Sequence, residues 1–311
     1  MSAGWSEKGR KAHEDSMIQA GARRGRWSLL LATDFQEPAR RALLHGMKLA
    51  TTLETSLTIL HVVKTPTDLP RRAPDGQALR SLRTSALLEL GRLTRLAKER
   101  GVSAQPLLLY GDPIGCIVET ARQVHAKMVV IGTEGRTGWD RLRIGSIARG
   151  VVREAPCPVL TVHGGLAGDG FRHPAKVRLR RVLLATDFSR DANSAFQIVR
   201  SLAPKLRASI RVVHASESPS NNKQAERMIT RQVRELQNDE IEAEGNCVQG
   251  APVEVILRQA AMYQTDLLVV GTSGRRGLSR MVLGSVAEAL IKRAGCPVLT
   301  AQHKREPFIT P

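Results

Sequence analysis

Two glycine-rich loops carry the residues best suited to hold a charged ligand. Each follows a short apolar run and obeys the pattern G-x2-G-x9-G-S. The first two glycines let the backbone turn and approach a pyrophosphate without a Cβ in the way. The closing Gly-Ser opens a predicted helix, whose free N–H groups, hydroxyl and positive dipole end face the same space. The residues are Gly132, Gly135, Gly145 and Ser146 in the first loop, and Gly271, Gly274, Gly284 and Ser285 in the second.

The chemistry asked of these loops is the holding of an anion, and no side chain needs to react. Arginines add a positive field to both loops: Arg136, Arg141, Arg143, Arg275, Arg276 and Arg280. The Walker lysine motif GxxxxGK[ST] does not occur, and the pattern includes no evident base that could activate water. We therefore predict no catalytic residue and no enzyme. The simpler interpretation of each loop is a tight strand-to-helix turn without a ligand.

The two loops belong to an internal duplication. The segment 30–35, Leu-Leu-Ala-Thr-Asp-Phe, recurs unchanged at 183–188. Further on, 16 of the 32 residues of 130–161 are identical to their counterparts in 269–300, at an offset of 139. The first copy has extra residues between His61 and Gly111, and a missed repeat of this kind would mislead the whole fold assignment.

Each copy alternates short β-rich runs with helical patterns. Helices are predicted in the first copy over 37–53, 78–100, 114–126 and 145–154. Near-continuous apolar strands that alternate with helices indicate a parallel sheet covered on both faces. The fold class is therefore α/β, with two tandem doubly wound domains of five parallel strands and about four helices each, and the ligand is expected at the carboxyl ends of the strands. The predicted strands are 28–32, 57–63, 105–110, 127–131 and 158–162, then 181–185, 209–214, 246–249, 266–270 and 297–301.

The repeat sets the predicted boundaries of the domains. We expect a disordered basic tail over 1–25, a first domain over 26–163, a linker over 164–178, a second domain over 179–303 and a C-terminal tail over 304–311. A strand at the end of each copy would leave an exposed sheet edge. We therefore expect 158–162 and 297–301 to pair or abut within one chain as an internal pseudo-dimer. Further dimerisation of whole chains is left open.

These motifs resemble the universal stress protein family in its tandem form, over about 26–163 and 179–302. In that family G-x2-G-x9-G-S is the ATP-binding signature, on an adenine nucleotide alpha hydrolase-like fold. The resemblance implies phosphate contacts for the eight loop residues above. It also implies that Asp34 and Asp187 contact the adenine end of the ligand, and that Val62 and Ala215 line the adenine pocket. Ala215 departs from the valine usual in the family.

Charge and composition limit the kinds of partner that the protein can have. The chain has 311 residues and 47 basic against 29 acidic ones, a net charge of +18, which favours anionic partners. The low aromatic content of 3% argues against a nucleic-acid surface built on base stacking. No apolar run is long enough to span a membrane, and the four cysteines form no CxxC pair that would suggest a thiolate metal site. We expect a cytoplasmic protein without a metal site or a membrane partner.

Other conspicuous residues have plainer interpretations. Asp34 and Asp187 could cap the following helices, a role compatible with ligand contact. His61 and His214 end buried strands without a metal-binding cluster, so we interpret them as hydrogen-bonded structural histidines. Cys157 and Cys296 precede the last strand of each copy, where burial beside the sheet is the expected role and redox activity would need a low-pKa thiolate.

The sequence thus predicts an ATP-binding stress-response sensor or regulator with two nucleotide sites, binding ATP with or without Mg. The alternative is a nucleotide-independent interaction scaffold or a nucleic-acid-binding accessory protein that uses the basic surface. Salt dependence separates the two, because contacts to nucleic-acid phosphates give a steep salt slope.

Overall fold

The computed structural model of the chain describes residues 28–64, 76–133, 144–163, 177–216, 222–274 and 283–303. Both predicted tails, most of the predicted linker, Gly135 and the six loop arginines lie outside these residues. The domain boundaries therefore stay a prediction.

The first half of the chain alternates strands and helices in the predicted order. Its elements are β1 (Ser28–Ala32), α2 (Glu37–Thr52), β2 (Ser56–Lys64), α3 (Gly76–Glu99), β3 (Ala104–Gly111), α4 (Pro113–Gln123), β4 (Ala126–Gly132), α5 (Ser146–Glu154) and β5 (Val159–Val162). The backbone after α3 reaches a φ of 76° at Gly101, whose N–H donates to Lys98 O at 2.9 Å. Only glycine adopts this left-handed conformation without strain, which explains where the helix stops.

The second half repeats this order. Its elements are β6 (Arg181–Ala185), α6 (Arg190–Leu206), β7 (Ser209–Ser216), α7 (Asn222–Asn238), β8 (Ala243–Gln249), α8 (Pro252–Met262), β9 (Leu267–Gly271), α9 (Ser285–Arg293) and β10 (Val298–Ala301). Strand β8 begins three residues before the predicted 246–249. Its first residues, Ala243, Glu244 and Gly245, pair with β7 although they carry no apolar run, because an edge strand is largely solvent-exposed.

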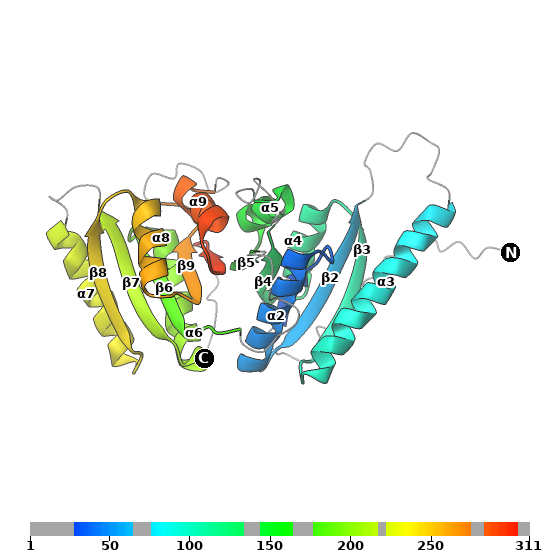
Figure 1. Ribbon diagram of the computed structural model, residues 1–311, viewed down its shortest axis with the longest axis horizontal. Helices are drawn as coiled ribbons and strands as arrows, with labels where there is room; N and C mark the ends of the chain where they lie inside the picture. The colour runs from blue at the N-terminus through cyan, green and yellow to red at the C-terminus, as the bar shows by residue number, and fades with distance from the viewer. Residues whose placement is uncertain are drawn as a thin grey trace.

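Both halves share one ten-stranded sheet, in the order β3-β2-β1-β4-β5-β10-β9-β6-β7-β8. Within each half the neighbouring strands are parallel, as predicted. The two halves lie side by side along the molecule (Figure 1). Where they meet, β5 pairs with β10 in antiparallel register, with Leu160 opposite Leu299. The predicted pairing of the two last strands within one chain is therefore confirmed.

Helices cover both faces of the sheet, each with its own buried core. One core packs the sheet against α2, α3, α6 and α7, and the other packs it against α4, α5, α8 and α9. The central strands supply both: Leu29 and Leu31 face the first core and Leu30 the second, and all three are at most 1% exposed. Since burying one leucine side chain contributes roughly 1.5–3 kcal/mol, these strands place the loops at their ends on a rigid base.

Candidate functional site

The chain order reverses once in each half. From β1 the chain continues to β2 and β3 on one side, and β4 and β5 lie on the other. In the second half the reversal lies between β6 and β9. Ligands of open α/β sheets bind in the crevice outside the carboxyl ends of the strands at such a point. At the first reversal, Asp34 follows β1 and Gly132 ends β4. At the second, Asp187 follows β6 and Gly271 ends β9.

The glycines that end β4 and β9 let a helix pack closely against the sheet. An added Cβ at Gly132 would lie 2.5 Å from both Pro38 C and Ala39 N, at the beginning of α2. An added Cβ at Gly271 would lie 2.7 Å from Ala192 N, at the beginning of α6. These are distances that real Cβ atoms do not reach. Close packing of helix on strand therefore requires glycine at both positions, whether or not a ligand binds.

In the second half the loop residues converge. Gly284 N donates to Thr272 O at 2.8 Å, which folds the beginning of α9 back onto the end of β9. A Cβ at Gly284 would lie 3.8 Å from Gly274 N, and a Cβ at Gly274 would lie 2.9 Å from Asp187 Oδ2. Asp187 therefore lies beside Gly274, and Gly274 lies near Gly284, so that the turn after β6 and the second loop come together at the end of β9. In the first half Gly135, the counterpart of Gly274, lies outside the described residues.

The Gly-Ser pairs open helices as predicted. Gly145 and Gly284 are the N-caps of α5 and α9, with φ of −56° and −63°, and neither helix has a side-chain cap. Ser146 and Ser285 begin the helices and are exposed. An uncapped helix N-terminus leaves N–H donors for water or for an anion.

The structure corrects the capping role suggested for Asp34 and Asp187. The N-caps of α2 and α6 are Gln36 and Ser189. Each aspartate instead accepts a 3.0 Å hydrogen bond at Oδ1 from the N–H two residues later, that of Gln36 or of Ser189. Such a bond shapes a turn, here with φ of 65° at Phe35 and 61° at Phe188. Asp34 is exposed, and Asp187 is half-buried beside the second loop.

His61 and His214, which lie inside β2 and β7 and do not end them, are hydrogen-bonded, as expected. His61 Nδ1 donates to Thr33 O at 2.8 Å, and His214 Nδ1 donates to Thr186 O at the same distance. Each ring also lies against the phenylalanine of the preceding turn, at a centroid distance of 4.3 Å for Phe35 and 4.9 Å for Phe188. These contacts tie β2 to the end of β1, and β7 to the end of β6.

Val62 and Ala215 come directly after these histidines. Both are half-buried and pack against the core formed with α4, α5, α8 and α9. Val62 is paired with Leu109 of β3, and Ala215 with Val248 of β8. The two predicted pocket residues thus occupy equivalent strand positions, and the shorter side chain of Ala215 leaves more room in the second half.

Asp191 is a residue of the site that the sequence analysis missed. Its Oδ2 accepts from Thr272 Oγ1 at 2.8 Å and from Ser273 N at 2.9 Å, and its Oδ1 accepts from His303 N at 2.7 Å. It therefore ties the second loop to the chain leaving β10. The available signal was an acidic residue in the first turn of a helix that follows a strand, which is common and therefore uninformative.

The first half holds its loop differently. The counterpart of Asp191 is Pro38, which has no acceptor side chain. Thr133 Oγ1 instead lies 2.9 Å from His163 Nδ1. Burial lowers the pKa of His163 to about 4, so the imidazole is neutral at neutral pH and can accept this hydrogen bond. The two sites are therefore supported by different contacts.

The cysteines next to the last strands behave as expected for structural residues. Burial raises the pKa of the Cys296 thiol to about 11, which is the opposite of the shift a reactive thiolate needs. Cys157 is half-buried and packs against the same core. Among the described residues, no three His, Cys, Asp or Glu side chains group as metal ligands. Within the same part of the chain, no helix is both long and apolar enough to cross a bilayer.

Comparison with known proteins gives a consistent result. The model of the universal stress protein family matches residues 28–163 and 178–302. A universal stress protein of Mycobacterium tuberculosis strain H37Rv is 28% identical over 229 residues, which cover 67% of this chain and 74% of that protein. One of Methanocaldococcus jannaschii is 30% identical over 136 residues, 43% of this chain and 80% of that protein. The crystal structure of one from Archaeoglobus fulgidus covers 89% of this chain and 98% of its own, with a TM-score of 0.73 and 21% identity, which supports the fold.

Proposed function

The chain belongs to the universal stress protein family, and from this premise we propose that it is a cytoplasmic regulator that binds ATP at the two switch points of its sheet. The observation that carries the proposal is the close approach of Asp187, Gly274 and Gly284 to one another at the end of β9. A binding protein of this kind responds to its ligand by a change of conformation or of partner.

The residues present fit a nucleotide. The uncapped beginnings of α5 and α9 offer N–H groups to the phosphates, together with the exposed hydroxyls of Ser146 and Ser285. Asp34 and Asp187, with Val62 and Ala215 behind them, are assigned to the adenine end. Since the described residues contain no metal-ligand cluster, we assign any accompanying Mg to the phosphates of the ligand.

We further propose that the site holds ATP rather than hydrolysing it efficiently. Efficient hydrolysis needs a group that positions or activates water next to the terminal phosphate. The eight glycine and serine residues of the two G-x2-G-x9-G-S patterns include no histidine or carboxylate that could act as this group.

The test compares two valine substitutions in the second half. Gly274→Val places a side chain against Asp187 Oδ2 and so obstructs the proposed nucleotide site, whereas an added Cβ at Gly295 has nothing within 4 Å. By isothermal titration calorimetry, Gly274→Val should lose one of the two ATP sites and Gly295→Val should keep both.

Two results would contradict the proposal at different points. If the unmodified chain binds no adenine nucleotide, and mass spectrometry of denatured, freshly purified protein finds none released, the function is wrong. If Gly274→Val keeps the full stoichiometry, ATP binds elsewhere and the assigned site is wrong.

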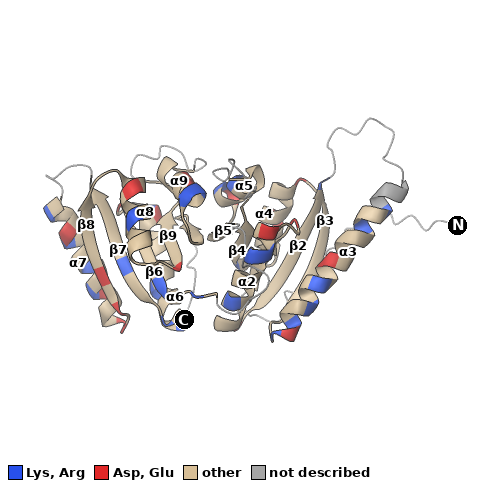
Figure 2. Ribbon diagram, viewed as in Figure 1, with Lys and Arg blue, Asp and Glu red and all other residues tan. Residues whose placement is uncertain are grey.

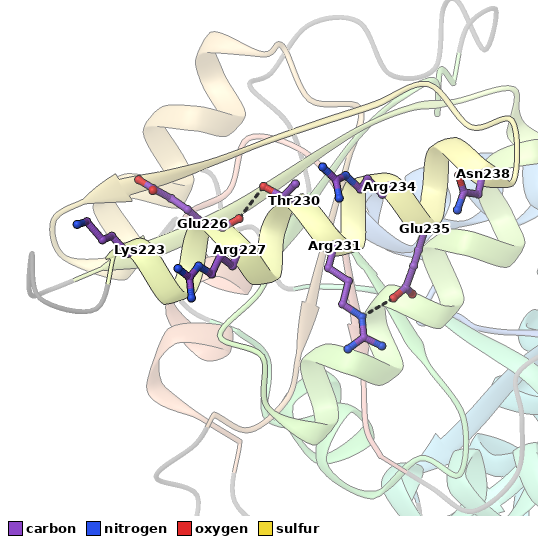
Figure 3. A pocket seen from close by; sticks show the side chains of 8 residues that line it. All are labelled: Lys223, Glu226, Arg227, Thr230, Arg231, Arg234, Glu235 and Asn238. Atoms are coloured by element: carbon purple, nitrogen blue, oxygen red, sulfur yellow. Dashed lines mark hydrogen bonds and ion pairs between the residues drawn. The ribbon is translucent and has the colours of Figure 1, made fainter.

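A second candidate function, binding of nucleic-acid backbone, is favoured by one observation on α7. Four basic side chains, spaced four, four and three residues apart, follow one face of this helix and line an open groove (Figure 3). Arg231 pairs with Glu235 at 2.9 Å, and Glu226 also lies in the groove. Helix α7 lies at the far end of the molecule from α3, away from the proposed nucleotide sites (Figure 2). The four residues are Lys223, Arg227, Arg231 and Arg234.

A salt titration of duplex DNA binding tests this candidate. Each neutralised phosphate contributes about −0.9 to the slope of log K against log salt, so the triple variant R227Q/R231Q/R234Q should flatten the slope by roughly 2–3. The matched control is R80Q/R83Q/R95Q on α3, which removes the same charge and should leave the slope unchanged. Equal slopes in all three proteins would reject α7 as the contact surface.

A further inference from the structure

The two halves meet around a local twofold relation. At the offset of 139 that relates the repeats, Leu160 corresponds to Leu299, and these two residues lie opposite each other where β5 pairs with β10. A side chain on the axis of this relation therefore faces its own repeat counterpart, whereas a residue away from the axis does not: Thr161 pairs with Val298. If two such counterparts are different residues, the contact between a first and a second half differs from the contact between two copies of the same half.

Several contacts at this interface do not distinguish the two. Thr161 Oγ1 donates to Val298 O at 3.0 Å, and its counterpart Thr300 Oγ1 donates to Val159 O at 3.1 Å. Both threonines are at most 1% exposed. Because each half supplies the same hydroxyl and the same carbonyl, these bonds and the strand pairing itself would form equally well between two copies of one half.

The first-turn residues of α5 and α9 do distinguish them. Arg149 and Glu288 are repeat counterparts of opposite charge, and Arg149 lies 2.8 Å from Glu288 Oε1 across the interface. Their side chains are 48% and 25% exposed. Glu288 also accepts a 2.6 Å hydrogen bond from Lys292 on its own helix. Two copies of the first half would place arginine against arginine, and two copies of the second would place glutamate against glutamate.

A second contact at this interface is also one-sided. Gln302 Nε2 donates to Val152 O at 2.7 Å and to Arg153 O at 3.0 Å, and so satisfies carbonyls at the end of α5. Its counterpart His163 has Nδ1 against Thr133 in its own half. The contact between the halves is therefore adapted to the unlike pairing at the end of α5 and at the residue that follows β10.

We propose that the Arg149–Glu288 contact makes this interface selective, so that it accepts the other half of the chain and disfavours a like half from a second chain. Backbone pairing supplies the affinity and the ion pair supplies the choice of partner. The consequence is that the central strands close within one chain instead of joining chains through like halves. This inference is independent of nucleotide binding.

Single charge reversals in the full chain reproduce the contacts of the rejected pairings. R149E places glutamate against glutamate, as two second halves would, and E288R places arginine against arginine, as two first halves would. Because the pair is partly exposed, we expect amide hydrogen exchange in 159–162 and 298–301 to accelerate by about two- to tenfold in each single variant. The double variant R149E/E288R restores opposite charges and should exchange more slowly than either single variant.

Two control variants distinguish loss of the contact between halves from loss of ion pairs within a single helix. K292Q removes the pairing of Glu288 within α9 and should leave exchange of the central strands near that of the unmodified chain. R122E, on α4, breaks an intrahelical pair with Glu119 and should do the same. The proposal is overturned if both single reversals exchange like the unmodified chain, or if the double variant exchanges at least as fast as the faster single variant.

Discussion

At Gly132 the backbone of α2 fills the space that a side chain would need, since an added Cβ would lie 2.5 Å from Pro38 C and Ala39 N. A glycine that a phosphate-binding pattern explains by ligand approach is thus already required by helix packing. The same holds for Gly271 against α6. Such a glycine pattern can be explained both by helix packing and by ligand binding. Among the described glycines of the two patterns, Gly274 and Gly284 point more directly to the proposed ligand site than Gly132 and Gly271 do.

This close packing predicts a stability effect that does not depend on nucleotide. Gly132→Ala should lower the free energy of unfolding by roughly 1–3 kcal/mol, because backbone must shift to make room. Gly91→Ala is the matched control on the exposed surface of α3, where an added Cβ has nothing within 4 Å, and it should stabilise by about 0.5–1 kcal/mol. Urea denaturation without ligand measures both, and an unchanged midpoint for Gly132→Ala would refute the packing argument.

At the scale of elements, apolar runs located the inner strands and the edge strand β3, but they located only the last residues of the other edge strand, β8. Strand β1 is buried along its whole length and was predicted over 28–32, as observed. Strand β8 exposes Glu244, Gly245 and Asn246, so only its last residues carried an apolar signal. The periodicity of side chains reports burial, and an edge strand such as β8 is held chiefly by its backbone pairing with β7.

Helix beginnings show the same division. The aspartates after β1 and β6 are turn residues, because a residue with positive φ separates each from the N-cap of the helix. From the sequence alone, an aspartate that lies between a strand and a helix is compatible with a helix N-cap and with a turn residue. The Gly-Ser beginnings of α5 and α9 were placed correctly, since glycine followed by serine before an apolar stripe is a specific signal.

At the scale of the whole molecule, Glu288, which joins the contact between halves but is paired chiefly with Lys292 of its own helix, predicts a pH dependence. The hydrogen bond from Lys292 lowers the pKa of Glu288 below its usual 4.5, opposed by burial and supported by the charge of Arg149. A lowered folded-state pKa contributes stability above pH 4.5, and this stability is lost as the pH falls through the folded-state value. The difference in unfolding free energy between the unmodified chain and Glu288→Gln should therefore be largest near neutral pH and shrink in acid. Urea titrations across this range check it, and a pH-independent difference would show that the carboxylate charge contributes nothing.

The internal duplication allowed most of the fold to be predicted from the sequence. Two copies of one pattern identified the alternation of strands and helices along the chain, the α/β class and the position of both loops, because burial and glycine chemistry are local properties of a few consecutive residues. The same reasoning predicted that the two last strands meet, and β5 and β10 do pair. The residues assigned to ATP rest on the family resemblance and stay a proposal.

Contacts between distant segments were decided only by the tertiary structure. Asp191 holds the loop after β9 across more than eighty residues of chain, and Arg149 finds Glu288 in the other half. Sequence specifies which groups are available, but their distances depend on how helices pack on the shared sheet. That packing is why two loops that share one glycine pattern are supported by an aspartate in one half and by a neutral histidine in the other.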